Sequence, residues 1–156
     1  MTFSQQIAKN LRDVYFGKNW TAVNLKDSLK GVTWKQAITK IDHLNTIAAL
    51  VYHINYYITA AAKVLEGDPL DAHDKYSFDV PVIESEGDWQ KLVARVFDET
   101  DRFAAQIETL GDEKLFENFD DPKYGNYFRN LMGIVEHAHY HLGQIVLLKK
   151  LIAVKS

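Results

Sequence analysis

The chain contains no cysteine among its 156 residues. This absence excludes disulfides, cysteine-ligated zinc sites and iron–sulfur clusters built from the chain's own side chains. Any thiol that takes part in its chemistry must therefore come from another molecule. Proline is also scarce, with 3 residues, and 47% of the chain is hydrophobic. This composition excludes collagen-like and intrinsically disordered chains.

Positive charge is not in surplus either. The chain carries 18 lysines and arginines against 21 aspartates and glutamates, which gives a formal net charge of -3. Because proteins neutralise nucleic-acid phosphates with a basic surface, we expect no nucleic-acid partner. Residues 1–16 lack the basic start and apolar run of a secretory signal, so we expect the protein to be cytoplasmic.

Charged side chains are absent from residues 43–62. A run of ~20 uncharged residues has the length of a membrane span. Polar side chains that are costly in lipid nevertheless recur within it. They are His43, Asn45, Thr46, His53, Asn55 and Thr59. We therefore expect no membrane insertion and interpret the run as a helix buried against several neighbours.

Four segments show apolar residues at the spacing of a helix. Thr2 and Thr33 each precede a glutamine by three residues, a helix-starting pattern in which each side chain accepts a hydrogen bond from the other residue's amide. Ser85 and Asp88 form a similar start. Long helices are predicted near residues 3–16, 34–66, 86–110 and 126–154. No strand pattern, repeat or linker is visible, so we predict an all-α four-helix bundle with one domain over residues 1–156.

The connection over residues 67–84 is long enough to cross the full length of such a bundle. The helices that it joins can therefore run parallel, whereas a short hairpin loop would force them to run antiparallel. The connection is polar at first and then apolar, so we expect it to lie across the bundle.

Three of the 6 histidines fall within five residues, at positions 137, 139 and 141. His137 and His141 are four residues apart, so their imidazoles lie one helical turn apart on the same face. They are close enough to share a metal ion. Such a pair lacks a third ligand, and most pairs of this kind bind nothing.

His53 is the candidate third ligand. It lies on an apolar face of the predicted helix 34–66, where an unpaired buried imidazole would cost ~1–3 kcal/mol. A nearby hydroxyl is the simplest partner for it. If its helix and helix 126–154 are antiparallel neighbours with aligned ends, however, His53 lies level with His137 and His141. Together the three histidines predict a divalent transition metal site, with zinc or nickel favoured because imidazole suits both.

The remaining histidines carry no such prediction. His139 lies on the other flank of its helix, away from the histidine pair. His43 is nearly three turns from His53 and on a different face, so we interpret it as a surface or edge residue. His73 lies in the connection 67–84, where nothing in the sequence holds it at the site.

Few other side chains qualify as helpers. Gln144 lies one turn beyond His141 on the same side and is predicted to orient that imidazole by a hydrogen bond. Tyr57 lies one turn beyond the third histidine, where it is either a hydrogen-bond donor to substrate or a core tyrosine with its hydroxyl at the rim. Glu136 is ~100° around the helix from its histidine neighbour, so it is not assigned as a base. The catalytic residues stay unknown.

The segment EHAHYHLGQIVLLKK, residues 136–150, resembles the closing helix of the DinB-like superfamily. In that family a His-x-x-x-His pattern is followed by a basic residue and then by Gly-Gln. The matching positions are His137, His141, Gly143 and Gln144. Leu142 stands where the family has the basic residue.

Two further segments extend the resemblance over nearly the whole chain. The segment NTIAALVYHINYY resembles the family's second helix, whose histidine ligand corresponds to His53. The stretch HDKYSFDVPVIESEGDW resembles the crossover of one subgroup. The resemblance implies a four-helix bundle in up-down-down-up order and a divalent metal held by three histidines, often in a homodimer. Characterised relatives include thiol-dependent transferases and isomerases.

Three neutral histidines leave coordination positions open, which is the arrangement of a catalytic metal rather than of a structural one. Such a metal lowers the pKa of a bound water or of an incoming thiol. We therefore predict a metal-dependent transferase or hydrolase that acts on a small-molecule substrate with water or a low-molecular-weight thiol. The alternative is a bundle or interaction module that keeps the metal only for stability.

Overall fold

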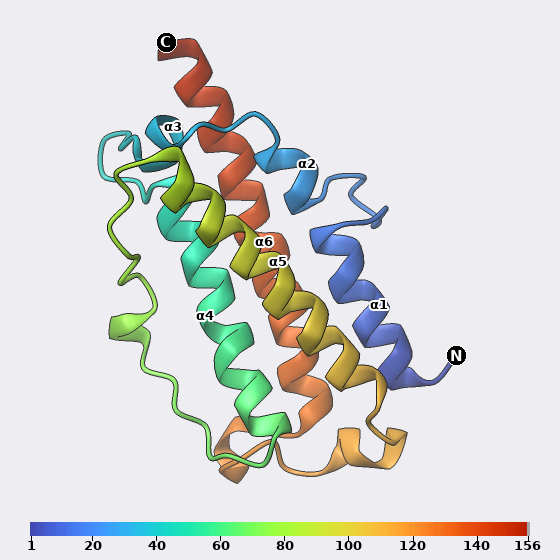
Figure 1. Ribbon diagram of the computed structural model, residues 1–156. Coiled ribbons are helices and arrows are strands. Elements are labelled where there is room, and N and C mark those ends of the chain that lie inside the picture. Colours follow the sequence, from blue (N-terminus) through green and yellow to red (C-terminus); the bar gives the residue numbers. More distant parts are fainter. Residues whose placement is uncertain (156) are drawn as a thin grey trace.

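The computed structural model describes residues 1–155 (Figure 1). Within this range every regular element is a helix, and four of the six α-helices are long. They are α1 (Phe3–Tyr15), α2 (Leu25–Leu29), α3 (Trp34–Ile38), α4 (Ile47–Leu65), α5 (Glu86–Glu108) and α6 (Tyr127–Lys155). Short 3-10 turns lie at Asp74–Tyr76, Asp112–Phe116 and Pro122–Tyr124. The prediction of an all-α chain with four long helices is confirmed.

The four long helices form a bundle in which α1 and α6 run one way and α4 and α5 run the other (Figure 1). α1 packs against α5 and α6, and α4 packs against the same two helices. The connection between α4 and α5 returns along the outside of α4, so the two helices are parallel neighbours (Figure 1). This is the up-down-down-up order that the resemblance implied.

Side-chain caps explain where these helices begin. The Thr2 hydroxyl accepts a hydrogen bond from the Gln5 amide at 3.2 Å, and the Gln5 side chain accepts one from the Thr2 amide at 3.0 Å. Thr33 makes the same reciprocal pair at the start of α3. The Ser85 hydroxyl accepts from the Asp88 amide at 3.2 Å and starts α5. Caps of this kind stabilise a helix by ~1 kcal/mol each.

The prediction of one continuous helix over residues 34–66 is wrong. α3 ends at Ile38, and residues 39–46 form a loop before α4 begins. The apolar residues keep a helical spacing across this loop, because Ile41 packs into the core with 4% of its surface exposed. Apolar periodicity alone therefore could not reveal the break.

Two local features separate α3 from α4. Asp42 has a φ of 47°, a left-handed conformation that a continuous right-handed helix excludes. Thr46 then caps α4, because its hydroxyl accepts a hydrogen bond from the Ala49 amide at 3.1 Å. His43 accordingly lies in the loop and not on a helix face.

The core lies between the four long helices, and a buried tryptophan ties it to the loop before α3. The Trp89 indole on α5 donates a hydrogen bond to the Val32 carbonyl at 2.9 Å. Buried Trp and Tyr side chains need such partners for their polar atoms. The largest fully buried side chains include Trp89, Tyr15, Phe103, Leu11, Ile58 and Leu131.

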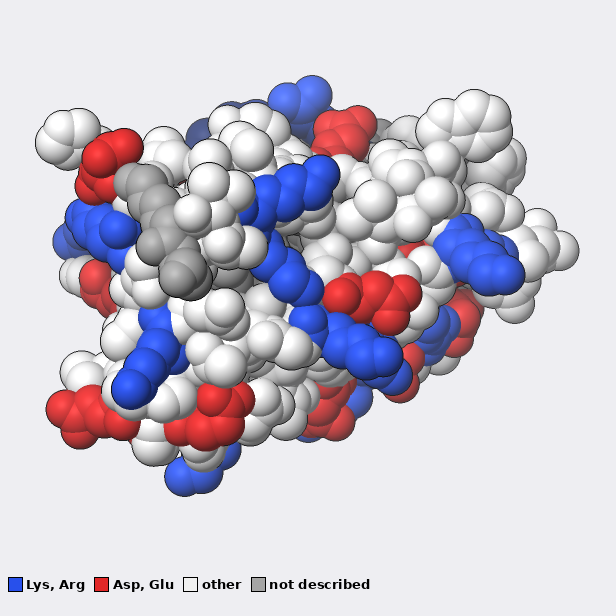
Figure 2. Space-filling view, turned by 90° about the horizontal axis from the view of Figure 1, so that it is seen from above, with Lys and Arg blue, Asp and Glu red and all other residues white. Residues whose placement is uncertain are grey.

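No helix within residues 1–155 is both long enough and apolar enough to cross a membrane. The uncharged residues of α4 are explained by packing, since α3, α5 and α6 all contact this helix. Figure 2 shows the end of the bundle that carries the C-terminus, where basic and acidic side chains are intermixed.

Candidate metal centre

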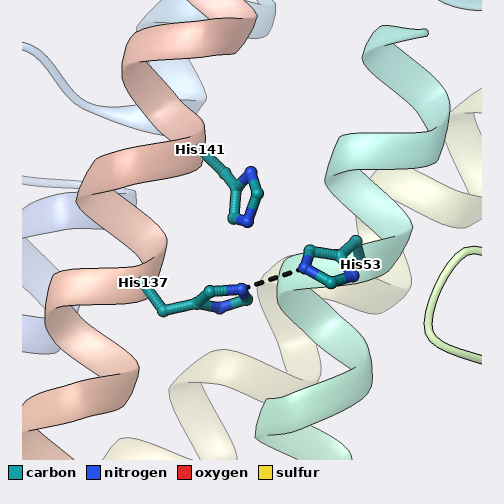
Figure 3. Close-up of side chains that lie close together, drawn as sticks. All are labelled: His53, His137 and His141. Carbon is teal, nitrogen blue, oxygen red and sulfur yellow. Dashed lines mark hydrogen bonds between the residues drawn. The ribbon is translucent and has the colours of Figure 1, made fainter. Parts of the chain in front are cut away.

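Three histidines from two helices converge in the space between α4 and α6 (Figure 3). His53 comes from α4, and His137 and His141 come from α6. One ring nitrogen of each lies within 4.8 Å of the others, and the Nε2 atoms of His53 and His137 are 3.0 Å apart. His53 and His141 are buried, with 5% and 7% of their surfaces exposed, and His137 is half-buried. The three are therefore positioned to bind a metal ion.

The direction of the two helices explains why these residues meet. α4 and α6 are antiparallel and in contact (Figure 1). His53 lies about three turns before the end of α4, and the other two histidines lie about three to four turns after the start of α6. Because α4 ends and α6 begins at the same end of the bundle, these distances are counted from one end. The three histidines therefore lie at a similar height along the bundle, as expected from the sequence.

Ser77 sets the orientation and protonation of the His53 ring. The hydroxyl of Ser77 has one hydrogen, which it donates to the Asp74 backbone carbonyl at 2.7 Å. The 3.0 Å contact between Ser77 Oγ and His53 Nδ1 is then a hydrogen bond donated by Nδ1–H. The hydroxyl partner expected of a core histidine is thus present, but on the nitrogen that faces away from the other imidazoles. Nε2 keeps its lone pair toward them, as in histidines that bind metals.

Gln144 sets the His141 ring in the same way. Its side-chain oxygen lies 2.7 Å from His141 Nδ1 and accepts the hydrogen bond from that N–H. Nε2 of His141 is then the atom with a free lone pair. The contact expected between the two residues is present, and its effect on metal affinity stays a prediction.

Aromatic rings enclose the histidines. The ring of Phe78 stacks on His53 with centroids 3.9 Å apart and planes inclined by 7°. The ring of Tyr57 meets His53 and His137 edge-on, at centroid distances of 5.3 and 5.0 Å. These contacts, together with the hydrogen bonds, restrict the rotation of the imidazoles and hold them in the convergent arrangement.

Two tyrosines of α4 hold the crossover against the site. The Tyr56 hydroxyl donates to the His73 carbonyl at 3.1 Å and accepts from the His73 amide at 2.8 Å. The Tyr57 hydroxyl donates to the Asp74 carboxylate at 2.7 Å. Tyr57 is half-buried beside the site, and its hydroxyl already has a hydrogen-bond partner in Asp74.

Sequence reasoning missed three residues of this site, Asp74, Ser77 and Phe78. All three belong to the crossover, which comes close to α4 only through tertiary contacts. The signal available in the sequence was the change from polar to apolar residues along 67–84, which indicated that the segment covers the bundle. No spacing rule relates a loop serine to a histidine on another element.

Burial lowers the pKa of all three histidines. For His137 the pKa falls to about 4, because the neighbouring imidazoles add to the effect of burial. The imidazoles are therefore neutral at pH 7, the form in which histidine binds a metal. Burial, and then the hydrogen bond to Asp74, raises the pKa of Tyr57 to about 12, so this hydroxyl stays a donor.

The other three histidines lie outside this group. His43 is in the loop between α3 and α4. His73 is exposed and pairs with Asp71 at 3.2 Å. Within the part of the chain that the structure describes, the group of residues able to hold a metal does not include these two or His139.

A cleft of about 740 Å³ opens beside the histidines. Its lining includes His53, Tyr57, Asp74, Arg129, Glu136 and His137. A smaller cavity of about 300 Å³ is lined in part by Gln144 and Leu147. A groove of about 610 Å³ between α4 and α5 has no histidine in its lining, so it does not offer the imidazole ligands of the candidate site.

The donor set fits a divalent transition metal. Imidazole nitrogens suit zinc and nickel, and two of the three rings already have their outer nitrogen engaged in a hydrogen bond. The cleft reaches two of the three histidines, so a further ligand has access to them. Three protein ligands with an accessible side are characteristic of catalytic metals, whereas a fourth protein ligand closes structural zinc sites.

Replacing Ser77 by alanine is expected to lower metal affinity by ~10–100-fold, the usual effect of removing the outer partner of a histidine ligand. The reason is that His53 Nδ1 loses its acceptor, and the ring is then free to turn or to change tautomer. Gln144→Ala is expected to act alike on His141. Competition of metal-stripped protein with a chromophoric chelator measures both effects.

Ser28→Ala is the matched control, because the Ser28 hydroxyl of α2 donates to the backbone carbonyl of Asn24, the residue that caps this helix, away from the histidines. An affinity of Ser77→Ala equal to that of this control would show that the serine does not position the ring.

A family model described as the DinB superfamily matches residues 20–145 of the chain. The match runs from the segment before α2 into α6 and contains all three histidines of the candidate centre. No curated protein and no solved structure gives a match. The chain belongs to the DinB superfamily.

Proposed function

We propose that this protein is a metal-dependent enzyme that uses His53, His137 and His141 to hold a divalent transition metal, zinc or nickel, at the edge of a substrate cleft. The observation that supports it best is the convergence of three neutral imidazoles beside a cleft of about 740 Å³. Clefts of a few hundred to about 1,000 Å³ accommodate small molecules. The reaction is a transfer or a hydrolysis on a small-molecule substrate.

A metal held by three histidines supplies one kind of chemistry: it makes a nucleophile from water or a thiol at neutral pH. The chain's own residues orient and enclose this centre. Ser77 and Gln144 accept hydrogen bonds from Nδ1 of two of the imidazoles and so leave their Nε2 lone pairs available to a metal. The Phe78 ring stacks on His53, and the Tyr57 ring meets it edge-on beside the cleft. The protein provides no thiol, so a thiol nucleophile must be a low-molecular-weight cosubstrate.

Asp74 is the candidate for hydrogen bonding to a substrate or for accepting its proton. Its carboxylate lines the cleft together with the histidines. The hydrogen bond from the Tyr57 hydroxyl lowers the pKa of Asp74, so the carboxylate is ionised at neutral pH. An ionised carboxylate held beside the cleft by a tyrosine can accept a hydrogen bond from an incoming thiol or water.

The accessible side of the centre favours an enzyme over a bundle that keeps metal only for stability. A homodimer, implied by the family resemblance, is part of the proposal. The test is a screen of zinc- and nickel-loaded protein with low-molecular-weight thiols and electrophiles, in parallel with esters and amides. Loss of free thiol and product masses are the readouts.

Turnover that needs metal and disappears in His137→Ala supports the proposal and assigns the reaction class. Turnover that persists unchanged in metal-stripped protein contradicts it. Full metal binding with no turnover of any thiol, ester or amide substrate would favour the stabilised-bundle alternative.

A further inference from the structure

The outer face of α6 differs from the outer face of α5. The exposed side of α5 is charged along its length, at Lys91, Arg95, Asp98, Asp101 and Arg102. On α6 a narrow stripe within about 80° of arc contains Arg129, Glu136, Tyr140, Gly143, Leu147, Lys150 and Val154, all exposed. Tyr140, Leu147 and Val154 expose 65%, 55% and 86% of their surfaces. An apolar centre between two charges is unusual for a face that only meets water.

The stripe has the symmetry of an antiparallel pair. Glu136 lies seven residues before Gly143, and Lys150 lies seven residues after it. Tyr140 and Leu147 flank the same glycine at three and four residues. A second α6 related by a two-fold axis at Gly143 therefore places opposite charges together at both ends and the two apolar side chains against each other in the middle.

The two charges are free to pair in this way. Neither Glu136 nor Lys150 has an ion-pair partner within the described residues. On α5, Arg95 pairs with Glu99 and Arg102 with Asp98 along the same helix, while Lys91 has no ion-pair partner within the described residues. The two charges of α6 can therefore pair with the opposite charges of a second α6 that runs in the reverse direction.

Gly143 supports a close helix approach. A Cβ built at this position would meet nothing within 4 Å, so the chain's own packing does not require a glycine there. Glycine within a helix costs ~0.5–1 kcal/mol relative to alanine. A small residue at the crossing point of two helices lets them approach to the lower end of the usual 8–10 Å.

We propose that a second copy of this chain docks on the outer face of α6 through a two-fold axis at Gly143, with Glu136 of each copy facing Lys150 of the other. This names the surface of the homodimer and does not depend on the proposed enzyme activity. The interface borders the candidate centre, because Glu136 lines the cleft and the Tyr140 ring lies 4.9 Å from the His141 ring. The second copy would therefore help to enclose the centre.

Charge reversal tests the proposal by sedimentation velocity on the full chain. Glu136→Lys and Lys150→Glu each place like charges together at both ends, and each is expected to weaken the dimer by about tenfold or more. The double variant restores opposite charges and is expected to dimerise as the wild type does. A 1:1 mixture of the two single variants is expected to form heterodimers, since every charge then meets its opposite.

Lys91→Glu on α5 is the control for the change in net charge, and circular dichroism checks that each variant is folded. Gly143→Leu, which places a bulky side chain in open space, is expected to weaken the dimer without lowering helix content. A wild type that is monomeric at high micromolar concentration overturns the proposal. A dimer that the single reversals do not weaken, or that the double variant fails to restore, also overturns it.

Discussion

Alanine in place of His53, His137 or His141 is expected to lower zinc or nickel affinity by more than about 100-fold. Loss of an outer hydrogen-bond partner already costs ~10–100-fold, and loss of a ligand removes the metal–nitrogen bond itself. The effect should be similar at all three positions, because one nitrogen from each faces the same space. Titration of metal-stripped protein against a competing chelator measures it.

His43, His73 and His139 are the matched controls, because none belongs to the group that can hold a metal. Their alanine variants should bind metal as the wild type does. If His139→Ala abolished metal binding while His53→Ala did not, the assignment of His53 as a ligand would be wrong. Both of its grounds, the convergence of α4 with α6 and the family's ligand pattern, would then have failed.

Metal is also expected to stabilise the fold strongly. At a free metal concentration 100 times Kd, binding to the native state alone contributes ~2.7 kcal/mol. Each kcal/mol raises Tm by ~2–4 °C in a chain of this size. Saturation with zinc should therefore raise Tm by about 5–11 °C, as followed by circular dichroism in a buffer without chelating components.

The position of the ligands explains why the native state binds the metal and the unfolded chain does not. α4 and α6 supply them from segments of the chain separated by more than 80 residues, so the metal links two helices of the core. His141→Ala provides the comparison, since its Tm should respond little to zinc. Equal shifts in the wild type and in His141→Ala would place the stabilising metal elsewhere.

The fold was predictable where local signals and tertiary packing agree. The capping pair at Thr2 and the apolar spacing predicted four long helices and the approximate ends of three of them, whereas the pair at Thr33 caps the short α3 and not α4. The break after Ile38 was not predictable from periodicity, because Ile41 continues the apolar spacing from a loop. The cap at Thr46 was the local signal that distinguishes the two cases.

The site was predictable only in part. His137 and His141 are neighbours by helix geometry, and His53 joined them through the argument that α4 and α6 run antiparallel. Ser77 and Phe78 could not be placed, because the crossover's path depends on the hydrogen bonds that the tyrosines of α4 make to it. Contacts between a loop and a helix leave no periodic signal in the sequence.

X-ray absorption spectroscopy of zinc-loaded protein tests the central claim most directly. We expect the scattering pattern of three imidazoles at ~2.0–2.1 Å, with at least one lighter oxygen ligand from solvent that a small thiol replaces with a sulfur at ~2.3 Å. If each single histidine variant shows two imidazole ligands where the wild type shows three, the ligand set is confirmed. A shell of four protein ligands that no thiol displaces, or one imidazole or fewer in the wild type, would contradict it.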